Sequence, residues 1–364
     1  MKLVLEDGTE ISGFSSGVSR AVAGEVVFNT GMAGYIEAMT DPSYRGQILV
    51  FTYPLIGNYG VPAARGGDSL DPPFESSRIQ IQGLVVQHLV DTYSHHGATR
   101  SLAEWLDSEQ IPYVTGIDTR TLTRKLREKG TMQGWLLPAG MDTQAGINQS
   151  KAIEMSKELF RLVAPAEPIL YRGGDLKILL IDVGAKDNIA RSLLARGATV
   201  MRVPWFDDLA RHASEADGIV IGNGPGNPKD LADLIEQLKQ IMADFDKPIF
   251  GICLGHQILA LAAGADTYKL PYGHRSVNQP VEDQLTRRCY VTSQNHGYAV
   301  DDRTLPRDWE PWFVNLNDGT NEGIRSRVGP LFSVQFHPES HPGPRDTEFL
   351  FDEYMRLVVA SAKG

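Results

Sequence analysis

One cysteine, Cys253, lies between an apolar run typical of a buried strand and the start of a helical pattern, in the segment FGICLGH at 250–256. Gly251 and Gly255 flank it, and this Gly-x-Cys-x-Gly sequence predicts a nucleophile elbow, a turn too crowded for side chains at the flanking positions. The helix N-terminus favours the thiolate form, and the N–H of Leu254 is expected to face the same space and serve an oxyanion. Most free cysteines are small buried hydrophobes, but this position favours a nucleophile.

A cysteine nucleophile needs a base that a third group orients. Among nine histidines, His337 ends an apolar strand in the segment FSVQFHPE at 332–339. Glu339 follows two residues later, and we expect it to accept a hydrogen bond from the imidazole and stabilise the imidazolium. The alternative for His337, a polar cap at a strand end, stays open at this level.

Other histidines of the same half carry weaker signals. His256 is expected to pack beneath the elbow, and His274 and His296 are expected in loops. No histidines or cysteines recur at metal-ligand spacing, so the sequence predicts no metal site.

A glycine-rich segment, IGNGPGNP at 221–228, follows a buried strand and precedes a helix. It lacks the G-x-G-x-x-G spacing of a dinucleotide loop, and Pro225 and Pro228 remove amide donors that a pyrophosphate needs. We expect it to line a small pocket and to direct one N–H at an oxyanion. No Walker A sequence occurs in the chain, so no nucleotide cofactor is expected here.

Strands and helices alternate from residue 176 onward. Apolar runs at 176–182, 198–203, 217–222 and 247–252 read as buried strands, and helices are expected over 188–196, 229–242, 254–263 and 346–362. This pattern predicts an α/β domain with an open, mostly parallel sheet and helices on both faces, which binds ligands at the carboxyl ends of its strands. Shorter strands are expected between the last two helices.

The first half instead predicts strands separated by turns, at 2–5, 25–28, 47–51 and 83–86. Helices are expected after Ser101, whose spacing to Glu104 fits a capping box, and after Asp118 up to Gly130. Residues 65–77 are expected to form a loop. We therefore predict an N-terminal domain over 1–160, a Pro- and Gly-rich linker over 161–175, and a C-terminal domain over 176–364.

Composition agrees with two globular domains, because 364 residues with 42% hydrophobic and 22% charged side chains can form two cores. The net charge of -10 argues against a binder of nucleic acid or anionic membranes. No apolar run is long enough for a transmembrane helix, and the acidic N-terminus does not resemble a signal peptide. The only cysteines, Cys253 and Cys289, exclude a disulfide framework, so a cytoplasmic location is expected.

The motifs NGPGNP, GICLGHQ and FHPE together resemble those of class I glutamine amidotransferases. In that family a cysteine attacks the side-chain amide of glutamine, a histidine protonates the leaving ammonia, and water hydrolyses the thioester. The resemblance implies that Cys253 is the nucleophile, His337 the general base and acid, and Glu339 the orienting carboxylate. It also implies that the amides of Gly226 and Leu254 form the oxyanion hole.

The rest of the chain resembles the small-subunit family of carbamoyl phosphate synthetase, through LVLEDGT, GEVVFNTGMAGYIEAMTDPSY, FTYPLIGNYGV, GIDTRTLTRKLREKG and QNHGYAVD. This resemblance implies a swivelling β/α N-terminal domain at the subunit interface, from which Ser43 reaches the glutamine pocket. The other implied glutamine-binding residues are Gly224, Gly226, Leu254, Gln257, Asn295, Gly297 and Tyr298. Taken singly, Gln257 also fits a helix surface, and the segments around Ser43 and Asn295 fit ordinary turns.

A partner and a pathway follow from the same resemblance. Ammonia is expected to pass to a large synthetase subunit, which binds ATP and metal ions and makes carbamoyl phosphate from bicarbonate for arginine and pyrimidine biosynthesis. No cofactor is expected in this chain. The alternatives are an amidotransferase subunit of another pathway, such as anthranilate or guanylate synthesis, and a regulatory subunit with a latent triad. Ser276, Val277, Gln279 and Phe336 depart from the usual family pattern.

Overall fold

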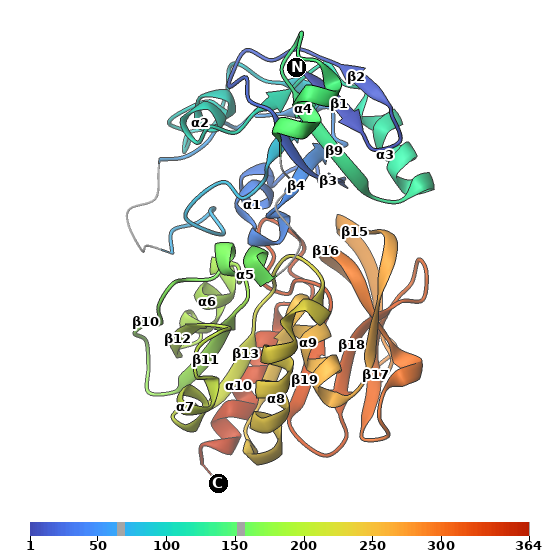
Figure 1. The fold of residues 1–364 in the computed structure, drawn as a ribbon. Coiled ribbons are helices and arrows are strands. Elements are labelled where there is room, and N and C mark those ends of the chain that lie inside the picture. The colour runs from blue at the N-terminus through green and yellow to red at the C-terminus, as the bar shows by residue number, and fades with distance from the viewer. Residues whose placement is uncertain (64–69, 151–156, 364) are drawn as a thin grey trace. The chain divides into compact units, whose positions relative to one another are not determined.

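A computed structural model describes residues 1–63, 70–150 and 157–363 (Figure 1). The chain forms two compact units, residues 1–154 and 155–364. No helix among the described residues is long and apolar enough to cross a membrane. Part of the predicted 65–77 loop lies outside the described residues.

The first unit contains a seven-stranded mixed sheet. Its strand order is β2 (Glu10–Ser12), β1 (Lys2–Leu5), β9 (Met132–Leu137), β3 (Val22–Asn29), β4 (Gln47–Phe51), β6 (Gly83–Val85) and β8 (Tyr113–Val114). A separate parallel pair consists of β5 (Leu55–Ile56) and β7 (His88–Leu89). The predicted strands at 2–5, 25–28, 47–51 and 83–86 are confirmed as β1, β3, β4 and β6.

The helices of this unit are α1 (Tyr35–Thr40), the 3-10 turn η1 (Pro42–Tyr44), α2 (Leu102–Ser108), α3 (Thr119–Lys129) and α4 (Thr143–Gln149). Both predicted helix starts are confirmed. Ser101 and Glu104 form the capping box of α2, and the Asp118 carboxylate accepts from the N–H of Thr121 at the start of α3. Gly130, with φ of 93°, ends α3, because a positive φ is cheap only for glycine.

The second unit contains a ten-stranded sheet whose centre is parallel (Figure 1). The parallel strands, in spatial order, are β12 (Thr199–Pro204), β11 (Lys177–Asp182), β13 (Gly218–Ile221), β14 (Ile249–Ile252) and β19 (Leu331–Val334). The short strand β10 (Ile169–Tyr171) adds antiparallel to β12. On the other side β18 (Asn321–Ser326), β17 (Trp309–Asn315), β15 (Asp266–Asp283) and β16 (Cys289–Asp301) extend the sheet antiparallel.

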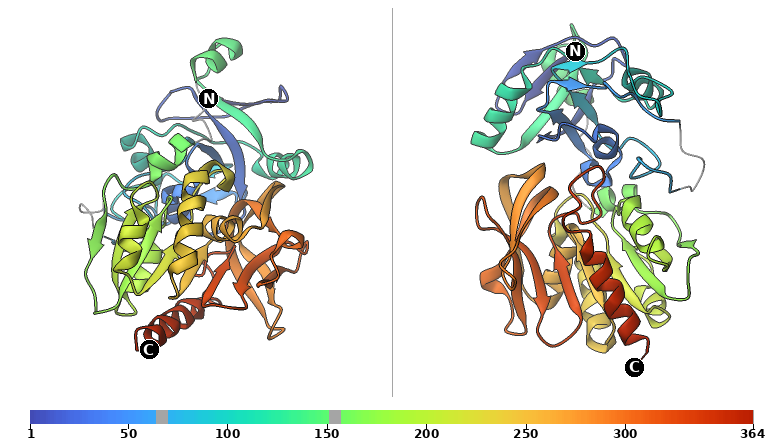
Figure 2. Two further views of the ribbon diagram at one scale, coloured as in Figure 1. Left: turned by 60° about the horizontal axis from the view of Figure 1, so that its bottom comes forward. Right: turned by 180° about the vertical axis from the view of Figure 1, so that it is seen from behind.

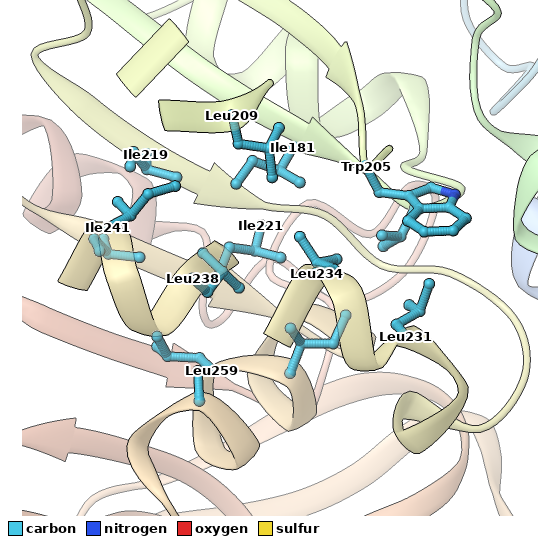
Figure 3. Close-up of a cluster of buried hydrophobic side chains, with 14 of the residues drawn as sticks. Ile181, Trp205, Leu209, Ile219, Ile221, Leu231, Leu234, Leu238, Ile241 and Leu259 are labelled. Carbon is cyan, nitrogen blue, oxygen red and sulfur yellow. The ribbon is translucent and has the colours of Figure 1, made fainter. Parts of the chain in front are cut away.

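Helices cover both faces of this sheet, as predicted. The helices α7 (Leu209–Ser214), α8 (Ala232–Asp244) and α9 (Leu254–Ala263) pack on one face over a core that includes Ile181, Ile221 and Leu238 (Figure 3). The opposite face carries α10 (Phe349–Ser361) (Figure 2, right). Phe351 and Tyr354 of this helix contact the ring of Phe250. Helix α6 (Asp187–Leu194) ends near α10, because Arg196, two residues after α6, contacts Asp352 at 2.6 Å. The 3-10 turn η2 (Pro228–Leu231) precedes α8. Complete burial of the central strands explains their uninterrupted apolar sequence.

Three features of this unit differ from the sequence analysis. The helix α7 was not predicted, and β15 and β16 are long strands rather than short ones. His274 and His296 therefore lie on strands, opposite each other across β15 and β16, and not in loops. Two register shifts in this ladder break the two-residue alternation by which strands are recognised.

Residues 161–175, the predicted linker, contain the end of α5 (Lys157–Val163) and the edge strand β10. The C-terminal unit therefore includes a strand that precedes residue 176. The proline and glycine content of this segment is compatible with a strand because β10 is at the edge of the sheet.

Candidate active site

Cys253 stands at a strained turn between β14 and α9, as the elbow motif predicts. Its φ of 55° is in the region that residues with a side chain rarely adopt. A Cβ at Gly251 would lie 2.6 Å from the carbonyl oxygen of Gly255, and one at Gly255 would lie 2.1 Å from that of Ile221. Both glycines are therefore required by backbone crowding. The thiol is buried, with the residue 2% exposed, rather than presented at the surface.

The order of strands in the sheet brings His337 to the elbow. Strands β14 and β19 are parallel neighbours with Ile252 opposite Val334, so their carboxyl ends coincide. The N–H of Cys253 donates to the carbonyl of Val334 over 2.9 Å, and His337 lies three residues beyond. Its Nδ1 contacts Oε1 of Glu339 at 2.6 Å, and both side chains are buried. The predicted His–Glu hydrogen bond is present.

The electrostatics of this pair favour an ion pair. Burial and the nearby Lys186 lower the pKa of His337, but attraction to Glu339 and Cys253 outweighs them and raises it to about 10. Burial raises the pKa of Glu339, yet His337 and Lys186 prevail and lower it to about 2. An imidazolium beside a carboxylate is the state in which the histidine holds a proton for a leaving group.

Lys186 is a site residue that the sequence analysis missed. Its Nζ lies 3.5 Å from Oε1 of Glu339, the oxygen that also contacts His337. The side chain is buried, and the backbone N–H donates to Oδ1 of Asn223 over 2.9 Å. The available signal was its position in the VGAK segment directly after β11, at the ligand-binding edge of the sheet.

A buried ionic network holds the loop that carries Lys186. Oδ1 of Asp182 accepts from the N–H groups of Gly184 and Ala185, each over 2.7 Å. Arg202, from the neighbouring strand β12, contacts Asp182 and donates to Asp187 at 2.7 Å. A third guanidinium bond reaches the carbonyl of Ala185 at 2.8 Å. This loop is therefore fixed by charge-assisted hydrogen bonds.

Gln335 is the second site residue that the sequence analysis missed. Its Nε2 lies 3.7 Å from Sγ of Cys253, and its Oε1 accepts from Nε2 of Gln257 at 3.0 Å. Gln257 also donates to the carbonyl of Tyr298 at 2.9 Å, so the predicted residues Gln257 and Tyr298 are in contact. A buried polar residue inside the apolar run FSVQF was the signal.

The remaining predicted residues of this unit lie around the same strand ends. The carbonyl of Asn295 accepts from Sγ of Cys253 at 3.7 Å, and Gly297 follows on β16. A Cβ at Gly224 would lie 2.2 Å from the carbonyl of Val183 and 2.9 Å from the side chain of Leu254. Gly226 has φ of 83°, a conformation suited to glycine.

Two further residues singled out in the sequence, His256 and Ser43, have defined positions in the structure. His256 lies on α9, and its Nδ1 contacts Oγ of Ser333 at 2.8 Å. Burial lowers its pKa to about 3, so the ring is neutral beneath the elbow, as expected. Ser43 lies in the other unit, buried in η1, where its N–H donates to the Asp41 carboxylate at 2.9 Å. Its part in a glutamine pocket stays a prediction.

An α/β sheet with a cysteine elbow and a His–Glu pair at adjacent strand ends defines a triad-type amidotransferase. Residues 179–357 match the family model "Glutamine amidotransferase class-I", and residues 3–136 match "Carbamoyl-phosphate synthase small chain, CPSase domain". The chain belongs to the carbamoyl phosphate synthase small-chain family. The resemblance drawn from the motifs is thereby confirmed.

Three curated relatives each match 98% of this chain. It is 48% identical to the carbamoyl phosphate synthase small chain of Symbiobacterium thermophilum, over 98% of both chains. It is 46% identical to the arginine-specific small chain of Aspergillus niger, over 98% of this chain and 79% of that one. The multifunctional protein URA2 of Saccharomyces cerevisiae is 47% identical over 98% of this chain, which spans 17% of that protein's length.

Proposed function

We propose that this chain is the glutaminase subunit of a carbamoyl phosphate synthetase. It hydrolyses L-glutamine and delivers the ammonia to a large ATP-dependent subunit. The observation that carries the proposal is the convergence of Cys253, after β14, with the hydrogen-bonded pair His337 and Glu339, after β19. Membership in the small-chain family supports the same reaction and the same partner.

The first half-reaction transfers the γ-glutamyl group to sulfur. In this proposal His337 accepts the proton of the Cys253 thiol as general base, and the thiolate attacks the amide carbon. The N–H groups of Gly226 and Leu254 donate to the oxyanion that forms. When the tetrahedral intermediate collapses, His337 protonates the departing ammonia, and a thioester remains on Cys253.

The second half-reaction releases glutamate. Water attacks the thioester carbon while His337, now neutral, accepts a proton from it. The new intermediate expels the Cys253 thiolate, which restores the starting ion pair. Glu339 holds the imidazole in one tautomer throughout through its bond to Nδ1. The ammonium group of Lys186, close to Glu339, offsets the negative charge that the Cys253 thiolate adds beside the His337–Glu339 pair.

Substrate recognition is assigned to polar groups around the same strand ends. In this proposal the glutamine main-chain groups are bound by Gln257, Gly224 and the Asn295–Tyr298 segment of β16, and by Ser43 from the N-terminal domain. The hydrogen bond from Gln257 to the carbonyl of Tyr298 supports a common orientation for these groups.

The proposed assembly is a heterodimer or a higher oligomer with the large subunit, in the cytoplasm. ATP and metal ions bind to the partner, and the product supplies arginine and pyrimidine biosynthesis. Names of the relatives that point to an arginine-specific chain and to a multifunctional protein support assignment to biosynthetic pathways. A reducing compartment suits a reaction that needs a free thiol.

The test is glutamate release from glutamine by the purified chain, alone and then with a large synthetase subunit, ATP and bicarbonate. We expect slow hydrolysis alone, strong stimulation by the partner, and formation of carbamoyl phosphate. Cys253→Ser should abolish both glutamine hydrolysis and carbamoyl phosphate formation. Cys289→Ser, at an exposed cysteine, should leave both activities intact. Hydrolysis that ignores the partner would assign the chain to another pathway. Absence of glutamate in every mixture would indicate a latent triad.

A further inference from the structure

A second cluster of titratable side chains lies among the antiparallel strands of the C-terminal unit. His274 on β15 and His296 on β16 are cross-strand partners whose rings meet edge to face at 4.9 Å. Glu322 on β18 joins them, and all three residues are buried. One nitrogen of each ring and a carboxylate oxygen lie within 4.8 Å of one another.

Spacing within the cluster fits ligands around one small cation. Oε1 of Glu322 lies 3.3 Å from Nδ1 of His274 and 3.9 Å from Nε2 of His296. Ligand atoms about 2.1 Å from a tetrahedral zinc ion lie about 3.4 Å from each other. Oε1 of Gln294, 3.2 Å from Nε2 of His296, can occupy a fourth position.

The outer ring nitrogens have the partners that metal-binding histidines usually have. Nε2 of His274 contacts Oδ2 of Asp318 at 2.8 Å, and Nδ1 of His296 contacts the carbonyl of Tyr298 at 2.8 Å. A carboxylate or a backbone carbonyl in this position fixes the tautomer and orients the other nitrogen toward a metal. In His296 this leaves Nε2 as the electron-pair donor facing Glu322.

The carboxylate itself is incompletely satisfied. Oε1 of Glu322 accepts from Nδ2 of Asn315 at 2.9 Å, but Oε2 is buried and has no hydrogen-bond partner among the described residues. A buried carboxylate oxygen without a partner costs free energy. A cation bound between the carboxylate and the two imidazoles would remove that cost.

We propose that His274, His296 and Glu322 bind a divalent first-row transition-metal ion, for which Zn²⁺ is the natural probe. Two imidazoles and one carboxylate form a ligand set suited to such ions. The ion would connect the hairpin of β15 and β16 to β18, from which β17 separates it in the sheet (Figure 1). The site is structural rather than catalytic, and it does not depend on the proposed glutaminase reaction.

Charge balance also favours a cation, because two carboxylates lie beside His274: Oδ2 of Asp318 at 2.8 Å and Oε1 of Glu322 at 3.3 Å. Because the sequence separations between the ligands, 22 and 26 residues along the chain, match no short metal motif, sequence spacing alone does not reveal the site.

The test uses the full chain after dialysis against a chelator. We expect Zn²⁺ to bind with a single ion per chain at micromolar or tighter affinity, measured by competition with a chromophoric chelator, and to raise Tm. Co²⁺ should give visible d–d absorption without a thiolate charge-transfer band. Cys253→Ser and Cys289→Ser should leave affinity unchanged, which separates this site from binding to sulfur.

Two variants make the assignment specific. Glu322→Gln removes the anionic ligand, and Asp318→Asn alters the hydrogen-bond partner of His274 without removing a ligand, so each should weaken Zn²⁺ binding by about 10- to 100-fold. The matched control is Glu310→Gln, at a carboxylate on β17 that pairs with Arg325 at 2.6 Å, which should leave affinity unchanged. Circular dichroism of metal-free variants verifies folding, and Asp318→Asn serves if Glu322→Gln does not fold. Failure of the parent chain to bind Zn²⁺, or unaltered affinity in folded variants, would overturn the proposal.

Discussion

The carboxamide of Gln335 touches the sulfur of Cys253, with its Nε2 3.7 Å from Sγ. Its orientation is fixed, because Oε1 of the same group accepts from Gln257 at 3.0 Å. The amide edge that faces the sulfur is therefore the donating edge. A fixed donor stabilises negative charge on the sulfur more than it stabilises the neutral thiol, which makes Gln335 a positioning residue for the proposed nucleophile.

Replacing Gln335 by leucine should lower kcat/KM for glutamine hydrolysis by about 10- to 100-fold, because a hydrogen bond to a charged group contributes about 1.5 to 3 kcal/mol. Most of the loss should be in kcat, since the donor acts on the nucleophile. Gln335→Glu should be worse, because it places a carboxylate beside the thiolate. For both variants, steady-state kinetics measure kcat and KM, and the rate of inactivation by an electrophilic glutamine analogue measures the reactivity of the nucleophile. Gln240→Leu, at an exposed position of α8, is the control, and a change confined to KM would contradict this role.

Glu339→Gln tests the orienting carboxylate. The variant keeps the size of the side chain but loses the charge that Nδ1 of His337 contacts at 2.6 Å. We expect kcat to fall by about 100- to 10,000-fold, as when a catalytic histidine loses its orienting carboxylate. Glu353→Gln, at a partly exposed position of α10 where the carboxylate pairs with Arg356 at 2.6 Å, is the matched control. Activity within a few-fold of wild type would remove Glu339 from the mechanism.

The same variant predicts a pH-dependent difference in stability. The pKa of His337 is about 10 in the folded chain against an ordinary 6.5, so its contribution to stability is complete below pH 6.5 and disappears as pH rises to 10. The pKa of Glu339 is about 2 against 4.5, so its contribution is complete above pH 4.5. The Tm difference between wild type and Glu339→Gln should therefore be largest near pH 5 to 6 and shrink toward pH 10. A difference that grows with alkaline pH would contradict the ion pair.

Local signals were sufficient for much of the fold. The elbow at Cys253 was predictable because a tight strand-to-helix turn requires glycine on both sides, and both glycines are in contact with backbone. The α9 limits, the α2 capping box and the carboxyl-edge position of His337 also follow from patterns within a few residues. Such signals depend on backbone sterics and hydrogen bonds that are local in sequence.

Contacts between distant strands were not predictable in the same way. Gln335 and Lys186 join the site only because β19 and β11 end at the same edge of the sheet. Their local signals, a polar residue in an apolar run and a position directly after a buried strand, do not specify that meeting. His274 and His296 were misplaced in loops because two register shifts obscure the alternation of β15 and β16. Strand order and bulges arise from tertiary packing, which a single sequence does not display.

Gly255→Ala tests whether the elbow tolerates a side chain. The added methyl group would lie 2.1 Å from the carbonyl oxygen of Ile221 and 3.0 Å from that of Gly222. Backbone atoms of a central strand cannot move away cheaply, so the free energy of unfolding should fall by about 3 kcal/mol or more. Gly97→Ala, where the nearest atom is a side-chain nitrogen at 3.4 Å, should be nearly neutral. Equal Tm values for the two variants in thermal unfolding would show that the elbow is not crowded.

His256 gives the opposite pH dependence from His337. Burial lowers its pKa to about 3 from an ordinary 6.5, so below pH 6.5 the unfolded chain binds a proton that the folded chain excludes. Stability is then lost as pH falls from 6.5 toward 3, by at most about 1.4 kcal/mol per pH unit for this group.

His256→Asn removes the titrating ring and keeps an amide donor for Oγ of Ser333, which contacts Nδ1 at 2.8 Å in the parent chain. The variant should lose some stability at neutral pH, where its packing is poorer, but lose less on acidification. Urea unfolding at several pH values between 4 and 7 measures the two slopes, with the exposed His341 replaced by asparagine as control. Parallel slopes for wild type and His256→Asn would mean that the ring is protonated in the folded chain.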